Sequence, residues 1–293
     1  MPAEGDLRRR PGSGGGVLIV AARTRAMTPK LQIVDLTKRF PATRSSSAGG
    51  GADSKAGWLG VLSRVSLDVG QREFVTLLGP SGCGKSTLCN IVAGLIPPDG
   101  GEVLLDGAPI GPRRGQVAYM QQKDLLLPWR RVIDNAILGL EIQGVARLEA
   151  RDEARDLLRR FGLERFEWYY PALLSGGMRQ RVALVRTLLC RKDVVVLDEP
   201  FGALDAMTRV AMRGYLLRLV EEFGRTILFI THDIEEAILL SDRIYVMSAR
   251  PGRIRAEIAV PLVRPRDPAH ATVVRTKAEI TAALHAEMAE AFS

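Results

Sequence analysis

The stretch at residues 79–87 has the residue types and spacing of a phosphate-binding loop. It reads "GPSGCGKST", which fits the pattern Gly-x-x-x-x-Gly-Lys-Ser. An apolar run at 73–78 predicts a buried strand before it, and residues 86–95 predict a helix after it, so a glycine-rich turn that carries Gly-Lys-Ser by chance is disfavoured. In this setting the loop amides and the helix N-terminus face an anion, Lys85 reaches the β- and γ-phosphates, and the Ser86 hydroxyl ligates Mg²⁺. The residues predicted to bind a nucleotide here are Gly79, Pro80, Ser81, Gly82, Cys83, Gly84, Lys85, Ser86 and Thr87.

Two carboxylates stand at the end of another apolar run. Residues 194–200 read "VVVLDEP", and four apolar residues in succession are typical of a buried parallel strand. Asp198 is predicted to hold Mg²⁺ through water, and Glu199 to orient and deprotonate an attacking water. Two surface acids at a strand end are the alternative, but the direct passage from the strand into Asp-Glu favours the catalytic interpretation.

The stretch "LLSGGMRQR" at residues 173–181 narrows the class of protein. Ser175, Gly176 and Gly177 before a helix offer free amides and a hydroxyl to an anion. The segment resembles the signature motif of nucleotide-binding subunits of ATP-binding-cassette (ABC) transporters. That resemblance implies a head-to-tail dimer with two ATP molecules between the subunits. Met178 stands where the family often has Gln, which leaves the Ser and both Gly residues in place.

Further motifs occur in the order that the resemblance implies. Gln122 would be the glutamine that contacts Mg²⁺ and responds to the membrane partner, with Gln121 as the alternative. Asp205 ends an Ala-Leu-Asp motif that matches the family's D-loop, and His232, after the apolar run at 226–231, would be the switch histidine at the γ-phosphate.

The residue that stacks on adenine is left open between two aromatic residues. Phe40 is the first choice, and Trp58 is the alternative, because the Ser/Gly/Ala-rich stretch at 41–57 is longer than the family usually has there. The resemblance covers roughly residues 30–265.

The remaining pattern predicts an α/β fold. Alternating residues at 31–40 and 61–69 predict an antiparallel pair, and the segments around 243–254 and 253–260 a closing β pair. We expect a phosphate-loop α/β core, an antiparallel β subdomain and an inserted helical subdomain at about 123–190. Residues 266–293 are predicted to form a C-terminal helical extension, with Ile280, Leu284, Met288 and Phe292 on a face that docks on its own domain.

Composition limits the other possibilities. The 293 residues are 46% hydrophobic and contain no apolar run of the ~18 residues that span a membrane. The three cysteines form neither a disulfide framework nor a zinc pattern, and the net charge of +8 comes without aromatic residues among the basic ones, so nucleic-acid binding is not favoured. Residues 1–29 are predicted to be a disordered basic tail, with Met1 or Met27 as the true start.

A phosphate loop is compatible with three classes of protein: another phosphate-loop enzyme such as a GTPase, a soluble ABC ATPase, and the ATPase subunit of a transporter. A guanine-specific Asn-Lys-x-Asp motif is absent from the sequence, which argues against a GTPase, and a tandem second cassette or coiled-coil arms, usual in soluble ABC ATPases, are absent too. The stretch "LLPW" at 126–129 and "SARPGRI" at 248–254 resemble the nitrate/sulfonate/taurine group of ABC importers. The resemblance implies that the apolar "LLLPW" at 125–129 receives a short helix of the membrane subunit, and packing in the core is the alternative. The resemblance implies a peripheral ATPase on the cytoplasmic face of the inner membrane. Its partners would be integral membrane permease subunits and, indirectly, an extracytoplasmic solute-binding protein.

Overall fold

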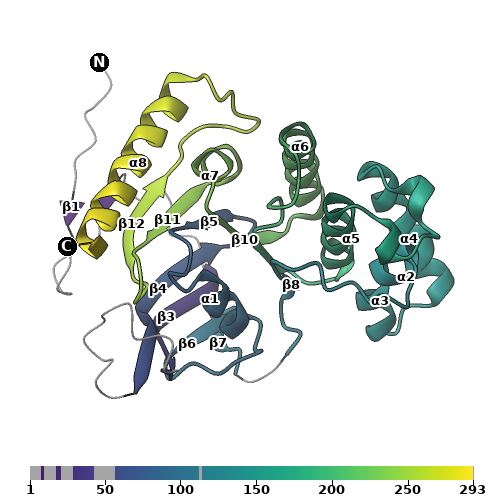
Figure 1. Cartoon of the computed structure of the whole chain (residues 1–293), viewed down its shortest axis with the longest axis horizontal. Helices are drawn as coiled ribbons and strands as arrows, with labels where there is room; N and C mark the ends of the chain where they lie inside the picture. Colours follow the sequence, from purple (N-terminus) through teal and green to yellow (C-terminus); the bar gives the residue numbers. More distant parts are fainter. Residues whose placement is uncertain (1–7, 10–17, 21–28, 43–56, 112–113, 293) are drawn as a thin grey trace. The chain divides into compact units, whose positions relative to one another are not determined.

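The structure is a computed structural model that describes residues 8–9, 18–20, 29–42, 57–111 and 114–292 (Figure 1). The chain divides into two compact units. The first comprises Met1–Arg114 and Leu228–Ser293, and the second comprises Gly115–Ile227. The loop predicted at 41–57 lies outside the described residues except at its two ends.

One sheet of the first unit is antiparallel. Strands β3 (Pro29–Pro41) and β4 (Trp58–Gly70) form the pair that alternation at 31–40 and 61–69 predicts, with Ile33 opposite Leu67. Strands β6 (Gly100–Leu105) and β7 (Ala108–Pro109) extend it in the order β4-β3-β6-β7. The antiparallel β subdomain is therefore confirmed.

The second sheet of this unit carries the phosphate loop. It contains β5 (Phe74–Leu78), β11 (Arg243–Met247), β12 (Ile254–Ala259) and, from Leu228 onward, β10 (Thr226–Thr231), in the order β12-β11-β5-β10. β11 runs parallel to β5 and antiparallel to β12, which confirms the predicted closing pair. The described residues of the same unit also form the helices α1 (Lys85–Val92), α7 (Ile234–Leu240) and α8 (Ala271–Phe292).

The prediction of a disordered N-terminal tail is wrong for its described residues. Arg8–Arg9 form β1, and Leu18–Val20 form β2, which pairs in parallel with β12. The β-branched Ile19 and Val20 suit a strand, and β12 offers an edge with free main-chain groups. The rest of the predicted tail lies outside the described residues.

The C-terminal helix packs on its own unit, as predicted. It begins at Ala271, and Ile280 is fully buried in an apolar cluster with residues of α7, β11 and β12, while Leu284 packs against the same cluster. The side chains of Met288 and Phe292 lie outside the described ones. The helix therefore adds to the core of the first unit.

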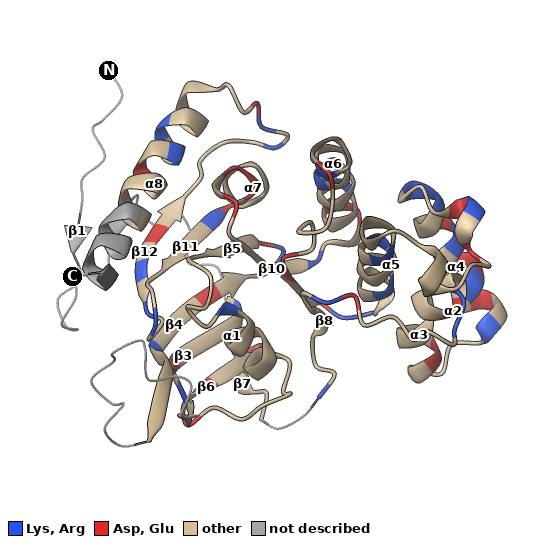
Figure 2. Cartoon of the chain, viewed as in Figure 1, with Lys and Arg blue, Asp and Glu red and all other residues tan. Residues whose placement is uncertain are grey.

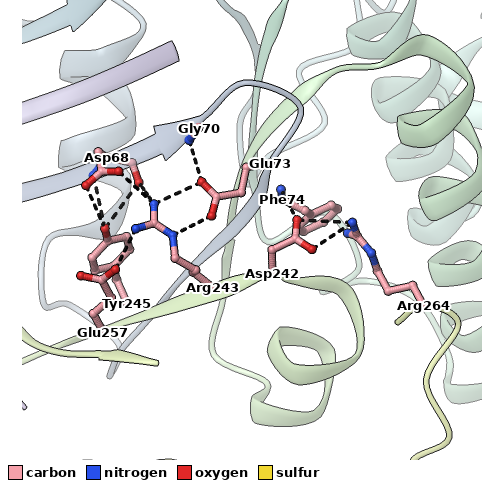
Figure 3. Close-up of polar contacts among 9 residues, drawn as sticks. All are labelled: Asp68, Gly70, Glu73, Phe74, Asp242, Arg243, Tyr245, Glu257 and Arg264. Carbon is pink, nitrogen blue, oxygen red and sulfur yellow. Dashed lines mark hydrogen bonds and ion pairs between the residues drawn. The ribbon is translucent and has the colours of Figure 1, made fainter. Parts of the chain in front are cut away.

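A largely buried arginine, Arg243 at the start of β11, joins β4, β12 and the residue before β5 in the first unit (Figure 3). Arg243 donates to Glu73 at 2.6 Å, to Glu257 at 2.7 Å and to Asp68 at 3.1 Å. Burial alone would lower the pKa of Arg243, but the carboxylates reverse that effect and hold the pKa above its usual value. Burial also raises the pKa of the neighbouring Tyr245. The cluster fixes the start of β5, the strand that leads to the phosphate loop.

The second unit contains a parallel strand pair and most of the helices. The helical subdomain predicted at about 123–190 lies within this unit, and its residues 131–163 form three separate helices. The elements are β8 (Ala118–Met120), α2 (Val132–Ala136), α3 (Leu138–Ile142), α4 (Arg147–Arg160), η2 (Glu164–Phe166), η3 (Pro171–Leu173), α5 (Gly176–Leu189), β9 (Val194–Asp198) and α6 (Ala206–Phe223). β8 pairs in parallel with β9.

Charged side chains tie α4 to its neighbours in the second unit. Both signs of charge alternate along α4 (Figure 2). Arg147 and Arg151 reach Asp134 of α2 at 2.9 and 2.7 Å. Burial tends to raise the pKa of Asp134, but these hydrogen bonds together hold it below its usual value.

Within the part of the chain that the structure describes, no helix combines the length and the apolar character needed to cross a membrane.

Candidate functional site

The predicted phosphate loop joins β5 to α1 in the first unit. β5 is buried along its whole length, and Lys85 begins α1. Gly82 and Gly84 have φ angles of 77° and 111°, in the left-handed region that glycine adopts without strain. A Cβ at Gly84 would also lie 2.8 Å from the Cδ2 atom of Leu62. Glycine at both positions therefore permits the tight main-chain path of a phosphate-binding loop.

The side chain of Lys85 folds over the loop. Its Nζ donates to the carbonyl oxygens of Gly79 at 2.7 Å and Pro80 at 2.9 Å, and the residue is only 7% exposed. Its positive charge therefore lies against the negative ends of two main-chain carbonyl dipoles. Main-chain amides with one lysine are a donor set that suits nucleotide phosphates. The adjacent Ser86 is exposed and can present its hydroxyl to a ligand.

Cys83 fills space within the same loop. It is buried, and burial raises the pKa of its thiol although the nearby Lys85 acts in the opposite direction. The thiol therefore stays protonated near neutral pH, in keeping with a packing role.

His232 lies directly after β10, the neighbour of β5 in the sheet. It is exposed, and the next residue, Asp233, caps α7 by accepting hydrogen bonds from the amides of Glu235 at 2.8 Å and Glu236 at 3.1 Å. The hydroxyl of Thr231 donates to the buried Glu236 carboxylate at 2.8 Å. These contacts fix the main chain on both sides of the histidine.

The two aromatic candidates for adenine stacking lie at the same end of the β3–β4 pair. Phe40 is opposite Leu59, and Pro41 is opposite Trp58, which is 47% exposed. The ammonium of Lys38 lies 5.4 Å from the centre of the Phe40 ring. The choice between Phe40 and Trp58 stays a prediction.

In the second unit, the strand β9 ends in the two predicted carboxylates. Asp198 is its last residue and is buried, while Glu199 is partly exposed and has φ of 49°. Left-handed backbone in a residue other than glycine stores strain, and such strain gathers at functional sites. Gln122 donates from Nε2 to Oε2 of Glu199 at 3.1 Å, so the structure brings these two predicted residues together. The alternative, Gln121, is the partly buried residue before it.

Gln180 is a residue of this region that sequence reasoning missed. It is buried in α5, donates from Nε2 to the carbonyl oxygen of Glu199 at 2.9 Å, and accepts at Oε1 from the amide of Ala203 at 2.8 Å. It therefore holds both ends of the segment between Glu199 and Ala203. The available signal was an amide five positions after Ser175 that shares a helical face with the apolar Ala183 and Leu184.

The signature segment opens α5. Ser175 is the N-cap, and its hydroxyl accepts from the amide of Met178 at 3.2 Å. Ser175 and Gly176 are exposed. A Cβ at Gly177 would lie 3.1 Å from Leu204, so the first turn of the helix packs closely against the residues before α6.

Asp205 has a local role in the second unit. It is the N-cap of α6 and accepts from the amide of Thr208 at 3.0 Å and from its hydroxyl at 2.6 Å. The hydrogen bond from the Thr208 side chain lowers the pKa of Asp205. The residue thus stays ionised, and it fixes the direction in which α6 begins.

The oxygen donors predicted for Mg²⁺ are chemically suited to that ion. Ser86 lies in the first unit, and Gln122 and Asp198 lie in the second. Mg²⁺ is bound by oxygen atoms, usually of one or two carboxylates together with substrate phosphates and water. Within the described residues, no group of three or more His, Cys, Asp or Glu side chains is placed to hold a metal by itself.

Comparison with known sequences agrees with these motifs. A family model described as "ABC transporter" matches residues 62–202. An uncharacterised ABC transporter ATP-binding protein of Methanocaldococcus jannaschii is 44% identical over 242 residues, which are 82% of this chain and 86% of that protein. The taurine import ATP-binding protein TauB of Rhizobium johnstonii is 47% identical over 203 residues, which are 69% of this chain and 78% of that protein.

Solved structures of ABC transporter cassettes are similar to this chain as well. A dimeric bacterial ABC transporter cassette superposes with a TM-score of 0.68 at 29% identity, over 80% of this chain and all of that one. A dimeric cassette in a post-hydrolysis state with ADP and Pi gives a TM-score of 0.69 at 28% identity, over the same shares. These similarities confirm the α/β fold predicted from the phosphate loop and the signature motif. The chain belongs to the ABC transporter family, as an ATPase whose hydrolysis of ATP is coupled to transport.

Proposed function

We propose that this chain is the ATPase subunit of an importer for a small solute of the nitrate, sulfonate or taurine type. The 47% identity to a taurine import ATP-binding protein carries the proposal. The chain would lie at the cytoplasmic face of the membrane as a peripheral subunit. It would bind integral permease subunits and would act indirectly with an extracytoplasmic solute-binding protein.

Two copies would form a head-to-tail dimer with two ATP molecules between them. The exposure of Ser175 and Gly176 supports this arrangement, because the N-terminus of α5 is accessible to an anion held by a second copy. Dimeric cassettes are also among the similar solved structures. Closure of the dimer on ATP would move the permease subunits, and hydrolysis would reopen it.

Each site residue has a role in this proposal. Lys85 and the loop amides bind the phosphates, and Glu199 takes the proton of the attacking water while Gln122 orients that carboxylate. His232 contacts the γ-phosphate from its fixed turn, and Asp205 sets the start of α6. Ser86, Gln122 and Asp198 hold Mg²⁺, which neutralises phosphate charge when it is bound.

The surface for the permease is proposed around residues 125–129. Leu125 is 50% exposed and Trp129 is 72% exposed, which is unusual for two large apolar side chains within five residues of the chain. The buried Asn135 holds the main chain beneath them, since its side chain accepts from the amide of Leu127 at 2.8 Å and donates to its carbonyl oxygen at 3.1 Å. The apolar groups are thus exposed on a fixed main chain, as a docking surface for a short helix requires.

Purification from native membranes in mild detergent tests this proposal. The tagged chain should bring down a stoichiometric protein with several membrane spans, identified by mass spectrometry. A Trp129→Ala variant should lose that protein and keep basal ATPase activity. Recovery of ribosomal or DNA-repair proteins instead, with the ATPase wholly in the soluble fraction, would reject the transporter assignment.

A further inference from the structure

The turn at residues 248–253, between β11 and β12, has no role in the proposed function, yet it lies against the phosphate loop. The register of the sheet explains this position. β11 is parallel to β5, and Val246 lies beside Leu78, the last residue of β5. The chain that leaves β11 therefore emerges next to the chain that enters the phosphate loop at Gly79.

Two residues of the turn contact the loop directly. The guanidinium of Arg250 donates from Nε at 3.1 Å and from a terminal nitrogen at 3.0 Å to the carbonyl oxygen of Gly82. A Cβ at Gly252 would lie 2.3 Å from the carbonyl oxygen of Cys83, so only glycine permits this approach. The turn thus reaches two successive carbonyl groups of the loop.

The turn is itself firmly held. The buried hydroxyl of Ser248 donates to the carbonyl oxygen of Ala249 at 2.8 Å and accepts from the amide of Arg253 at 3.0 Å. The amide of Gly252 donates to Val61 of β4 at 2.9 Å, and its carbonyl oxygen accepts from the amide of Ser63 at 3.0 Å. Arg250 therefore projects from a turn that is closed by Ser248 and anchored to β4.

We propose that Arg250 is a positioning residue for the phosphates of the nucleotide. The inference rests on the proposed function of the loop. The two hydrogen bonds from the Arg250 guanidinium, a two-pronged fork on the Gly82 carbonyl oxygen, fix the orientation of the Gly82–Cys83 peptide group. They also hold Gly82 at its φ of 77°. The same hydrogen bonds polarise that peptide and make the Cys83 amide a stronger donor. Arg250 thus prepares the loop for its anion by binding a carbonyl oxygen, a group that does not itself bind phosphate.

Nucleotide titrations of the full chain test this role. Arg250→Met removes the guanidinium, Arg250→Lys keeps the charge without the fork, and Arg253→Met is a matched control that removes an exposed charge from the same turn. We expect Arg250→Met to raise the Kd of fluorescent ATP and ADP analogues by the same factor, roughly 3- to 10-fold, as for one lost charge-assisted hydrogen bond at an exposed site. Arg250→Lys should fall between the wild type and Arg250→Met, and Arg253→Met should stay within about 2-fold of the wild type.

Steady-state kinetics separate positioning from other effects. KM for ATP should rise with Kd in Arg250→Met, while kcat at saturating ATP stays within about 2-fold of the wild type. The reason is that the residue stabilises bound ATP and the transition state equally. An unchanged Kd, an equal shift in Arg253→Met, or a fall in kcat at constant KM would each overturn the inference. If the unmodified chain bound neither nucleotide, the proposed function itself would fail, and this inference with it.

Discussion

The phosphate loop is held at its main-chain carbonyl oxygens by charged side chains, whereas Glu199 is held by the neutral side-chain amides of two glutamines. In the first unit, Lys85 and Arg250 donate hydrogen bonds to carbonyl oxygens of the loop, and Gly252 packs closely against another. In the second unit, Gln122 binds the Glu199 carboxylate and Gln180 binds its carbonyl oxygen.

This difference suits two different tasks. A loop held through its main chain and glycine contacts is already shaped for an anion before the anion arrives, which lowers the cost of binding. A carboxylate held by an exposed glutamine can exchange that partner for a water or an ion at little cost. The first region is therefore suited to binding and the second to a response that follows binding.

The loss of Lys85 should break the first region most severely. Lys85→Ala removes the buried ammonium and leaves the carbonyl oxygens of Gly79 and Pro80 without it. We expect ATP affinity to fall by about 100-fold or more, the equivalent of roughly 3 kcal/mol for a lost charged contact. Isothermal titration with MgATP measures the change, and wild-type steady-state kinetics in this variant would contradict the assigned role.

Glu199→Gln should break the second region and leave the first intact. The variant keeps the shape of the side chain but removes the proton acceptor, so kcat should fall on the order of 10²–10⁴-fold with nearly unchanged ATP affinity. Single-turnover hydrolysis and nucleotide titration together measure the split. The variant should also accumulate an ATP-bound dimer, and a monomer by light scattering in excess MgATP would count against the sandwich arrangement.

Local chemistry could be predicted from the sequence, and contacts between distant segments could not. The phosphate loop, the Asp198–Glu199 pair and Ser175 each lie within a short stretch whose flanking apolar runs fix its element, so their placement follows from local pattern. The hydrogen bond from Arg250 to Gly82 joins residues 168 positions apart. It depends on β11 pairing with β5, which no local pattern specifies. Likewise β2 exists because β12 offers it an edge.

The ion pairs of Asp134 in the second unit allow a test of what holds α4 against α2. Asp134→Asn weakens the hydrogen bonds from Arg147 and Arg151 to a carboxylate that is 11% exposed, and should cost about 1–3 kcal/mol in the free energy of unfolding at pH 7. Asp152→Asn is the control, because Asp152 pairs with Arg155 at an exposed site and should cost under about 0.5 kcal/mol. Urea titrations measure both variants.

The difference in the free energy of unfolding between the wild type and Asp134→Asn should depend on pH in one direction only. The folded pKa of Asp134 lies below its usual value, so the carboxylate contributes its full stability above the unfolded pKa of about 4 and loses it as pH falls through the folded pKa. The difference between wild type and Asp134→Asn should therefore be constant from pH 7 to pH 5 and shrink below about pH 4. A difference that grows in acid would show that the charge of Asp134 is not what stabilises α4.

Removal of residues 1–26 should have the smallest effect, and it tests whether the first region depends on anything beyond its central strands. The deletion removes β2 from the edge of β12, while β11 and β5, which carry the turn and the phosphate loop, keep each other as neighbours. We expect a loss of about 1 kcal/mol or less, a fall in Tm of a few degrees at most, and ATPase activity within about 2-fold of the wild type. A deletion of residues 1–16 is the control: it removes the two-residue β1 but retains β2 beside β12, and it should change Tm less than the longer deletion does. A tenfold loss of activity on deletion of residues 1–26 would show that support for the phosphate loop extends to the edge of the sheet, because β12 is joined to the turn that carries Arg250.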